Sequence, residues 1–442
     1  MPVVRYHCAG GNGHNRPNAP ARHHQPLPAR RSDARLAPGV TLGQLYSRPR
    51  LPMSEPLDFR PWSDETKADP YPLYARLRAE APVRYHEKLG VWTVARHRDV
   101  EQALRDWETF SSASGITVGG FAGLKPMIIL MDPPRHNELR RLLSRAFTPR
   151  RVAVLEERMR AVAADLLDPM VSTGGGDLVV RFARPYPATV IAELLGVDPG
   201  DRQAFCRWSD AIMLSGSDAA ELETAYGNIF EYFETTVARR RRRQGEDLVS
   251  SLLRGESAGG GLSEDELLGF CALLLIAGHE TMTNFLSLSA LTVDRLPGLR
   301  RELLEDPGLV VAAVEELLRF EPPVHGLART VTADVELGGR IIPKGDMVLL
   351  LIGSANRDPA AFDDPDGFEL ARVNGDNAAF GFGVHYCMGA GLARLEARVG
   401  LEELLRHMPE FTVVADPLRW RSLIPTRGPV ELPVTTTRRQ TD

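Results

Sequence analysis

The stretch Phe380-Gly-Phe-Gly383-Val-His385-Tyr-Cys387-Met-Gly389 decides the fold of this chain. It places one cysteine in a glycine-punctuated loop, directly before a helical pattern. Glycines have no Cβ, so backbone N–H groups can approach the sulfur, and the start of the following helix favours the cysteine as an anion. The loop therefore suits a thiolate that is presented to a large, flat cofactor. The alternative is a buried free cysteine in a glycine-rich turn, the ordinary fate of a lone cysteine.

Composition is that of a soluble globular protein. The 442 residues are 43% hydrophobic and 25% charged, with a net charge of −5, which gives no case for nucleic acid or an anionic membrane surface. The four cysteines show no paired spacing, which argues against disulfides or a zinc site and for a reducing compartment. No run reaches the roughly 18 to 20 apolar residues of a membrane span. The sequence predicts a cytoplasmic protein that contacts neither membrane nor nucleic acid.

The N-terminal segment 1–52 differs from the rest of the chain. It carries eight arginines against the single acid Asp33 and shows no hydrophobic periodicity, so we expect a disordered basic extension. A nucleic-acid-binding arm and a transit segment are the alternatives. We favour a start at Met53, with residues 53–442 forming a single folded domain.

A long helix is predicted in the second half of the chain. Ser263-Glu-Asp-Glu266 forms a capping box, and the helical pattern continues to about Arg295, before Pro297. Midway lies Ala277-Gly278-His279-Glu280-Thr281, although glycine within a helix costs about 1 kcal/mol relative to alanine. The simplest interpretation is a helix irregularity in which Thr281 bonds back to a carbonyl.

The rest of the pattern predicts a mainly α protein with a minor β region. We expect helices over 71–81, 97–107, 136–167, 186–195, 201–214 and 219–244, a hairpin over 83–94, and strands over 330–336 and 347–352. The arginine run Arg239–Arg243 closes a predicted helix, where cations complement the helix dipole, so we expect a solvated helix end and not a nucleic-acid site.

The cysteine loop resembles the haem-thiolate loop of cytochrome P450, with the pattern Phe-x-x-Gly-x-His/Arg-x-Cys-x-Gly. All five fixed positions are filled, by Phe380, Gly383, His385, Cys387 and Gly389. The resemblance implies the cytochrome P450 fold as a single haem domain, with haem b as cofactor. Cys387 would be the axial iron ligand, whose electron donation favours cleavage of the O–O bond.

The middle of the long helix is similar to the oxygen-activation segment of the same family, Ala-Gly-x-Asp/Glu-Thr. By this resemblance, Ala277 and Gly278 open a groove over the haem for O₂. Glu280 and Thr281 would deliver protons to the distal oxygen as a general-acid relay.

The family's Glu-x-x-Arg motif is present as well. Glu316 and Arg319 fill its Glu-x-x-Arg pattern, which implies a structural ion pair behind the proximal side of the haem. The expected position of a third member holds Gly367, and Arg372 is the candidate substitute.

Four residues match the family's contacts to the haem propionates. His136 and Arg140 fall in an Asp-Pro-Pro-x-His-x-x-x-Arg segment, and Arg329 and His385 match the other two positions. Their positive charges and N–H donors suit carboxylates.

The resemblance implies a monooxygenase that inserts one oxygen atom of O₂ into an apolar small molecule. The chain ends soon after the cysteine-loop helix, so we expect separate redox partners, a ferredoxin and its NAD(P)H-dependent reductase, docking near Arg141, Arg145 and Arg394. The alternatives are a peroxide-driven or oxidative-coupling enzyme on the same scaffold and, from another class, a non-catalytic haem sensor or carrier. We expect the substrate pocket at 115–128, 211–214, Leu274, Ala277, 324–327 and 423–424.

Overall fold

The structure is a computed structural model, and it describes residues 57–118, 125–144, 147, 152–214, 219–256, 261–370, 372, 376–422 and 424–436. All of them belong to one compact unit, Thr41–Asp442. The segment 1–52, predicted to be disordered, lies outside the described residues.

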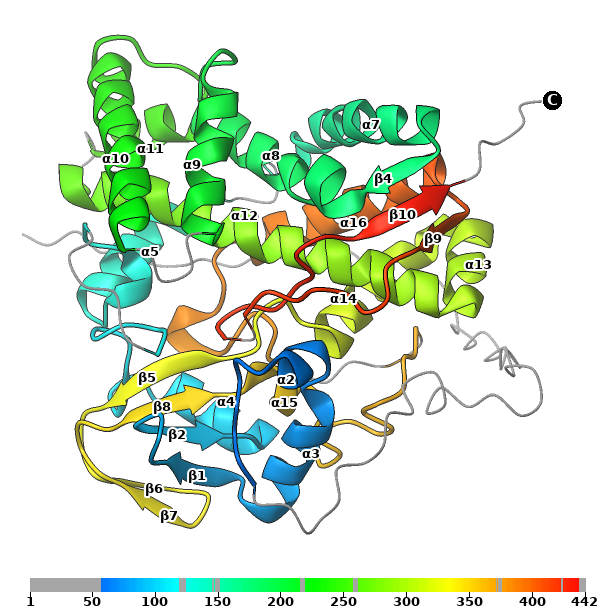
Figure 1. The fold of residues 1–442 in the computed structure, drawn as a ribbon. Coiled ribbons are helices and arrows are strands. Elements are labelled where there is room, and N and C mark those ends of the chain that lie inside the picture. Colours follow the sequence, from blue (N-terminus) through cyan, green and yellow to red (C-terminus); the bar gives the residue numbers. More distant parts are fainter. Residues whose placement is uncertain are drawn as a thin grey trace, which may run out of the picture. The chain divides into compact units, whose positions relative to one another are not determined.

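The described residues form a mainly helical molecule with a smaller β part (Figure 1). The α-helices are α2 (Asp64–Ala68), α3 (Tyr71–Glu80), α4 (His97–Arg105), α5 (Arg135–Ser144), α7 (Glu156–Ser172), α8 (Pro185–Leu195), α9 (Arg202–Leu214), α10 (Ala219–Arg242), α11 (Leu248–Glu256), α12 (Glu264–Arg295), α13 (Pro297–Glu305), α14 (Val310–Phe320), α15 (Ile352–Ala355) and α16 (Ala390–His407). Short helical turns are η1 (Ile128–Leu130), η2 (Val179–Ala183), η3 (Pro307–Leu309) and η4 (Gly383–His385).

Half of the described strands form one sheet, which lies beside the helices (Figure 1). The strands are β1 (Val83–His86), β2 (Val91–Val94), β3 (Phe110–Ser111), β4 (Gly175–Asp177), β5 (Leu327–Val331), β6 (Val335–Leu337), β7 (Arg340–Ile342), β8 (Met347–Leu350), β9 (Phe411–Val413) and β10 (Pro433–Thr436). The main sheet has the order β1-β2-β8-β5-β3, and β2 and β8 pair in parallel. The predicted hairpin is confirmed as β1 and β2, which pair antiparallel.

One predicted strand is divided in the structure. The pattern over 330–336 was expected to form one strand, but its start belongs to β5 and its end to β6. β6 leaves the main sheet and pairs with β7 through a turn at Gly338 and Gly339, both with positive φ. Glycine tolerates that conformation without steric cost, and the tight turn draws β6 into its own hairpin.

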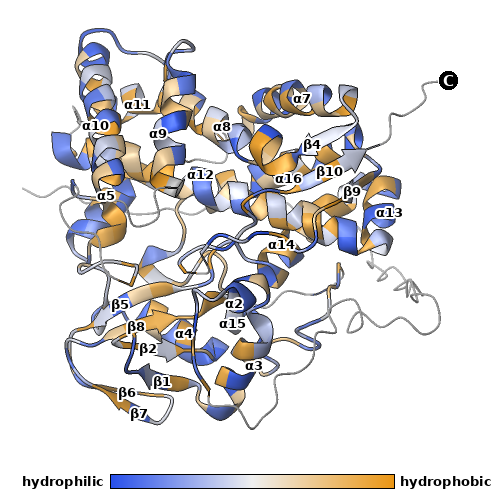
Figure 2. Ribbon diagram, in the orientation of Figure 1, coloured by the Kyte–Doolittle hydropathy of each residue, from blue (hydrophilic) through white to orange (hydrophobic). Residues whose placement is uncertain are grey.

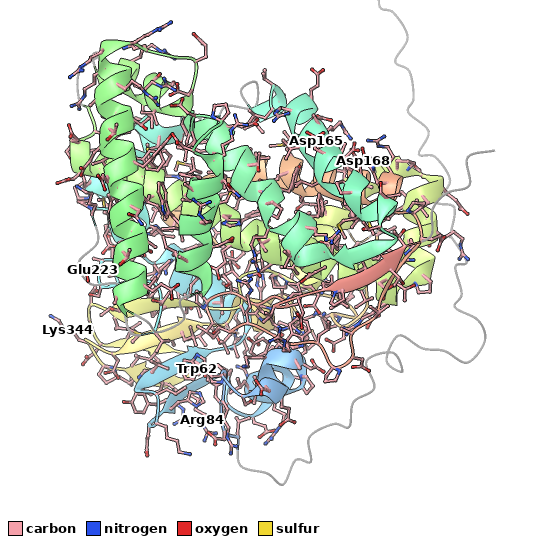
Figure 3. All side chains as sticks on the ribbon, turned by 45° about the horizontal axis from the view of Figure 1, so that its top comes forward. Trp62, Arg84, Asp165, Asp168, Glu223 and Lys344 are labelled. Carbon is pink, nitrogen blue, oxygen red and sulfur yellow. The ribbon has the colours of Figure 1, made fainter. Side chains whose placement is uncertain are left out.

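A predicted helix is also divided. The pattern over 136–167 yields α5 and α7, which end and begin at Ser144 and Glu156. Pro149 lies between them in the sequence, and the residue before a proline is disfavoured in helical conformation. α7 is two-sided: it buries Val162 and Leu167 and exposes acids such as Asp165 and Asp168 at its outer surface (Figures 2 and 3).

The long helix α12 is the central element of the helical part, as predicted. Both halves of the capping box are present, because the Ser263 hydroxyl accepts from the Glu266 N–H at 3.2 Å and the Glu266 carboxylate accepts from the Ser263 N–H at 2.8 Å. Most of its side chains are buried in core clusters shared with α8 and α16. α12 is also the one helix in the described part of the chain that is long and apolar enough to cross a membrane, a test that buried core helices pass as well.

The arginine run forms a helix end, as predicted. Arg239, Arg240 and Arg241 lie in the last turn of α10 and pair with Asp198, Asp247 and Glu264. These neighbouring carboxylates, together with the helix dipole, account for the charge run without a nucleic acid.

Candidate functional site

The cysteine loop is closed by its own backbone. The Cys387 N–H donates to the Phe380 carbonyl at 2.8 Å, and α16 begins three residues after the cysteine. Gly383 has a φ of +69°, and a Cβ there would lie 2.8 Å from the Leu104 carbonyl oxygen of α4. The glycine is therefore required twice, by its backbone conformation and by the close approach of α4.

Substitution of Gly383 by alanine is expected to destabilise the protein by about 1–3 kcal/mol through the positive φ, and further through the contact with Leu104. Gly381 is a matched control: its φ is also +69°, but nothing lies within 4 Å of a Cβ there. Denaturant unfolding of both alanine variants measures the difference. Equal losses at the two positions would show that the packing against α4 contributes nothing.

The groups around Cys387 counteract the effect of burial on the pKa of its thiol. Burial raises the pKa of the thiol, whereas a hydrogen bond from the Gly389 N–H and the positive charges of Arg140 and Arg394 act to lower it. Donors and cations directed at the sulfur favour the thiolate, which is the form that binds a metal. Of the described cysteines, Cys271 is fully buried and has only an acid, Asp247, near its sulfur. Its environment favours an inert thiol.

The four predicted propionate ligands come together beside Cys387. The rings of His136 and His385 lie 4.3 Å apart, and the positive charges of Arg329 and Arg140 act on His385. Burial is the main cause that lowers the pKa of His385 to about 3, and the charges of His136, Arg329 and Arg140 lower it further. Arg140 donates to the Tyr386 carbonyl at 2.7 Å, next to the cysteine.

Arg329 provides the test of whether these residues fit a haem. Its side chain is only 4% exposed, and its guanidinium donates to the adjacent Ala328 carbonyl. Among the described residues no carboxylate forms an ion pair with it; Asp132, the acid that acts on it, accepts from the Ser111 hydroxyl at 2.5 Å and from the Ser112 N–H. Burial lowers the pKa of Arg329 to about 10. A buried cation without a counter-ion fits the carboxylate of a bound group, as a haem propionate would supply.

The middle of α12 lies across from this cluster. Met388, next to the cysteine, packs in the same core cluster as Leu274 and Ile276 of α12. Ala277 is exposed and its neighbours Ile276 and Gly278 are half-buried, although most of α12 is buried, so the helix faces open space at this point. Gly278 lies against α8, where a Cβ would come 2.5 Å from Cδ1 of Ile191.

The two predicted proton donors have different partners. The Thr281 hydroxyl donates to the Ala277 carbonyl at 2.6 Å, the back-bonding that the sequence allowed, and its lone pairs remain able to accept. The Glu280 carboxyl accepts from the Thr426 hydroxyl at 2.5 Å. Burial raises the pKa of Glu280, against the effects of Thr426 and of the Arg421 charge. No sequence pattern pointed to Thr426, which lies 146 residues away along the chain.

The Glu-x-x-Arg pair forms a buried ion pair, and Arg372 completes it. Arg319 binds both carboxylate oxygens of Glu316 at 2.7 and 2.8 Å, and both side chains are at most 1% exposed. Arg372 binds the same carboxylate at 3.1 Å, so it supplies the third member that was in doubt. Gly367 contributes only its carbonyl, which accepts from Arg319 at 2.7 Å.

Asn356 ties this network to the cysteine loop. Its side-chain oxygen accepts from the Ala378 N–H at 2.7 Å, just before the loop begins, and its carbonyl accepts from Arg319. The ion pair therefore supports the backbone that leads to Cys387.

The predicted surroundings of the site are only partly described. Residues 119–124, Arg145 and Leu423 lie outside the described residues, as do the side chains of Met213 and Leu214. Ile424 is buried near Gly326, where a Cβ would lie 2.8 Å from its Cδ1. Within the described part of the chain, no group of three or more His, Cys, Asp or Glu side chains could hold a metal ion by itself.

Comparisons with known proteins agree with this geometry. The family model described as Cytochrome P450 matches residues 199–426. Cytochrome P450 monooxygenase PikC of Streptomyces venezuelae is 38% identical over 393 residues, which cover 86% of this chain and 94% of PikC. The structure of cytochrome P450 CYP109Q5 from Chondromyces apiculatus matches with a TM-score of 0.81 and 38% identity, over 86% and 98% of the two chains. CYP109E1 from Bacillus megaterium, solved in complex with testosterone, matches at 33% identity and a TM-score of 0.77, over 83% and 99%.

Proposed function

The chain belongs to the cytochrome P450 family and is a monooxygenase, and we propose that it inserts one oxygen atom of O₂ into an apolar small molecule with electrons from separate redox proteins. The observation that carries the proposal is the buried, unpaired Arg329 beside His136, His385 and Cys387. A cation in that setting is stabilised by a carboxylate of a bound group, and the nearby thiol is the ligand that haem iron accepts.

The residues present have separate tasks in this reaction. Haem b, when bound, supplies the iron at which O₂ is activated, with Cys387 as its thiolate ligand. Arg329, Arg140, His136 and His385 would hold the propionates by charge and hydrogen bonds. On α12, the Thr281 hydroxyl accepts or donates a hydrogen bond. Glu280 supplies protons, and burial raises the pKa of its carboxyl, which favours the protonated form.

Replacement of Glu280 by glutamine is expected to lower the rate of product formation by about 10²-fold or more, because the amide cannot deliver a proton. NAD(P)H oxidation should fall less than product formation, with the difference released as peroxide. Simultaneous assays of NAD(P)H, peroxide and product measure this coupling. If the wild-type enzyme formed no product with NAD(P)H and redox proteins but turned over fully with added peroxide, the peroxide-driven alternative would be favoured. The Glu280–Thr281 pair argues against that alternative.

Electron delivery is proposed at the face behind Cys387. Arg141 is exposed on α5, whereas Arg394 is already paired with Glu315 at 2.6 Å and lies over the Phe380 ring at 4.4 Å. Arg141 is thus the better candidate contact for an acidic ferredoxin, and Arg394 supports the cysteine loop.

Charge reversal by Arg141→Glu is expected to slow ferredoxin-supported reduction several-fold and to weaken its dependence on ionic strength, because steering charges act on the association rate. Stopped-flow reduction at two salt concentrations measures both effects. Reduction by dithionite is the control and should not change. An unaltered salt dependence would remove Arg141 from the docking surface.

The substrate is proposed to be predominantly apolar. The candidate pocket segments are rich in aliphatic side chains, such as Leu274, Val324 and Ile424. The related CYP109E1 was solved with testosterone, a ligand of that character. A cytoplasmic location fits such a soluble enzyme and its soluble partners.

A further inference from the structure

The hairpin that carries Thr426 also carries a half-buried arginine, Arg421, that acts on Glu280. Arg421 lies in the hairpin over 420–429, where its N–H donates to the Gly428 carbonyl at 3.0 Å. All three nitrogens of its guanidinium are shielded from solvent and have no hydrogen-bond partner. An unpaired buried cation is costly, so a charged arginine persists there only when an opposite charge compensates it in some state of the protein.

Glu280 is the acid placed to compensate it. Arg421 is the one charged group that acts appreciably on the Glu280 carboxyl, and Glu280 is the acid with the largest effect on Arg421. The second acid near Arg421, Asp210 of α9, acts on it less than Glu280 does, and it also lies 3.6 Å from Nε of Arg184, a contact longer than a hydrogen bond. Glu280 has no other cation of this kind among the described residues.

The same hairpin holds the Glu280 carboxyl in place. Thr426 is 8% exposed, and its backbone is fixed by a bridge to Val324. Its hydroxyl binds the Glu280 carboxyl. A hydroxyl can donate to a carboxylate and accept from a carboxylic acid, so this contact can persist in both protonation states. A guanidinium has no acceptor and favours only the ionised state.

We propose that Thr426 and Arg421 are positioning residues for Glu280: the hydroxyl holds the carboxyl in both protonation states, and the guanidinium is its counter-ion after the proton has left. This inference rests on the proposed role of Glu280 as a proton donor. Each proton that Glu280 gives to the distal side is replaced by one from water, and Arg421 keeps its own protons throughout. The hairpin thereby sets how readily Glu280 gives up a proton.

The other charged groups around this pair do not offer the same compensation. Burial lowers the pKa of His279, on α12, to about 3, so it is neutral. Its Nε2–H donates to the Arg184 carbonyl at 2.9 Å, and its Nδ1 accepts from the Ser209 hydroxyl. Tyr226 of α10 lies near enough to Glu280 for the carboxylate to act on it, and burial chiefly raises its pKa to about 12, so it is neutral as well. Arg184 is the charged group with the largest effect on Arg421, but it is a cation and repels the Arg421 charge, so it offers no compensation.

The test is the protonation of Glu280 itself, followed by infrared spectroscopy of the haem-loaded protein between acid and alkaline pH. The carboxylic acid band that disappears in Glu280→Gln identifies the residue. In Arg421→Gln, the midpoint at which this band is lost should rise by about 1–3 pH units, because removal of a nearby cation destabilises the carboxylate. Arg421→Lys keeps the charge and should stay near the wild-type midpoint.

Arg419→Gln is the matched control on the same hairpin. Arg419 is 69% exposed and pairs with Glu431, so its removal should leave the midpoint unchanged. Thr426→Val should shift the position of the band, since the carboxyl loses its hydrogen bond, and Thr426→Ser should restore it. An unchanged midpoint in Arg421→Gln would overturn the inference even if Glu280 delivers protons. Full coupling of NAD(P)H to product in Glu280→Gln would instead overturn the proton-donor role on which it rests.

Discussion

Replacement of Cys387 by serine is expected to abolish monooxygenase turnover and the spectrum of a thiolate-bound haem. The serine hydroxyl is nearly isosteric, so the loop closed by the Phe380 carbonyl should persist. A hydroxyl, however, does not form the anion that the Gly389 N–H and the charges of Arg140 and Arg394 favour at the sulfur. Absorption of the reduced protein under carbon monoxide and a turnover assay measure the two losses together.

The control for that variant is Cys206→Ser. Cys206 lies on α9, outside the cysteine loop. Burial raises the pKa of its thiol to about 11, so the thiol is not ionised. This change should leave spectrum and turnover as in wild type. Retention of a thiolate spectrum in Cys387→Ser would assign the iron ligand to another cysteine.

Removal of Arg319 by substitution with methionine is expected to lower the free energy of unfolding by about 3–5 kcal/mol, because it leaves the Glu316 carboxylate buried with only Arg372 as its cation. The variant also loses the hydrogen bonds that Arg319 donates to the carbonyls of Asn356, Pro365 and Gly367. Denaturant unfolding followed by circular dichroism measures the loss.

An exposed ion pair provides the comparison. Arg419→Met breaks the pair with Glu431, in which the side chains are 69% and 39% exposed, and should cost at most about 1 kcal/mol. Similar losses in the two variants would show that burial of the Glu316–Arg319 pair adds nothing to stability. Glu316→Gln together with Arg319→Met should recover part of the loss, since the buried carboxylate is removed and Arg372 keeps Glu369, 3.7 Å away, and its bonds to backbone carbonyls.

The features predicted correctly from sequence are those encoded over short distances. The capping box of α12 needs only Ser263 and Glu266, and the hairpin of β1 and β2 needs only alternation around a turn. The cysteine loop carries its glycines at fixed spacing, and the structure shows why Gly383 is one of them. In each case the residues that decide the conformation lie within a few positions of one another.

The features that were missed depend on contacts between distant segments. The hydroxyl that holds Glu280 comes from Thr426, 146 residues further along the chain. Arg372 was named from the sequence only as a candidate, and its contact with Glu316, 56 residues away, confirms it. The prediction of one helix over 136–167 was wrong for a local reason instead: it gave hydrophobic periodicity more weight than the proline in that stretch of the sequence. The pairing of Gly278 with Ile191 required the packing of α8 on α12, which periodicity alone does not give.

The central claim is that Cys387 binds haem iron as a thiolate, and the most direct measurement is the absorption spectrum of the purified, dithionite-reduced protein with and without carbon monoxide. The account predicts haem in the purified protein and a strongly red-shifted Soret band on addition of carbon monoxide. A band typical of histidine-ligated or thiol-ligated haem, or the failure of the folded protein to bind haem at all, would contradict it.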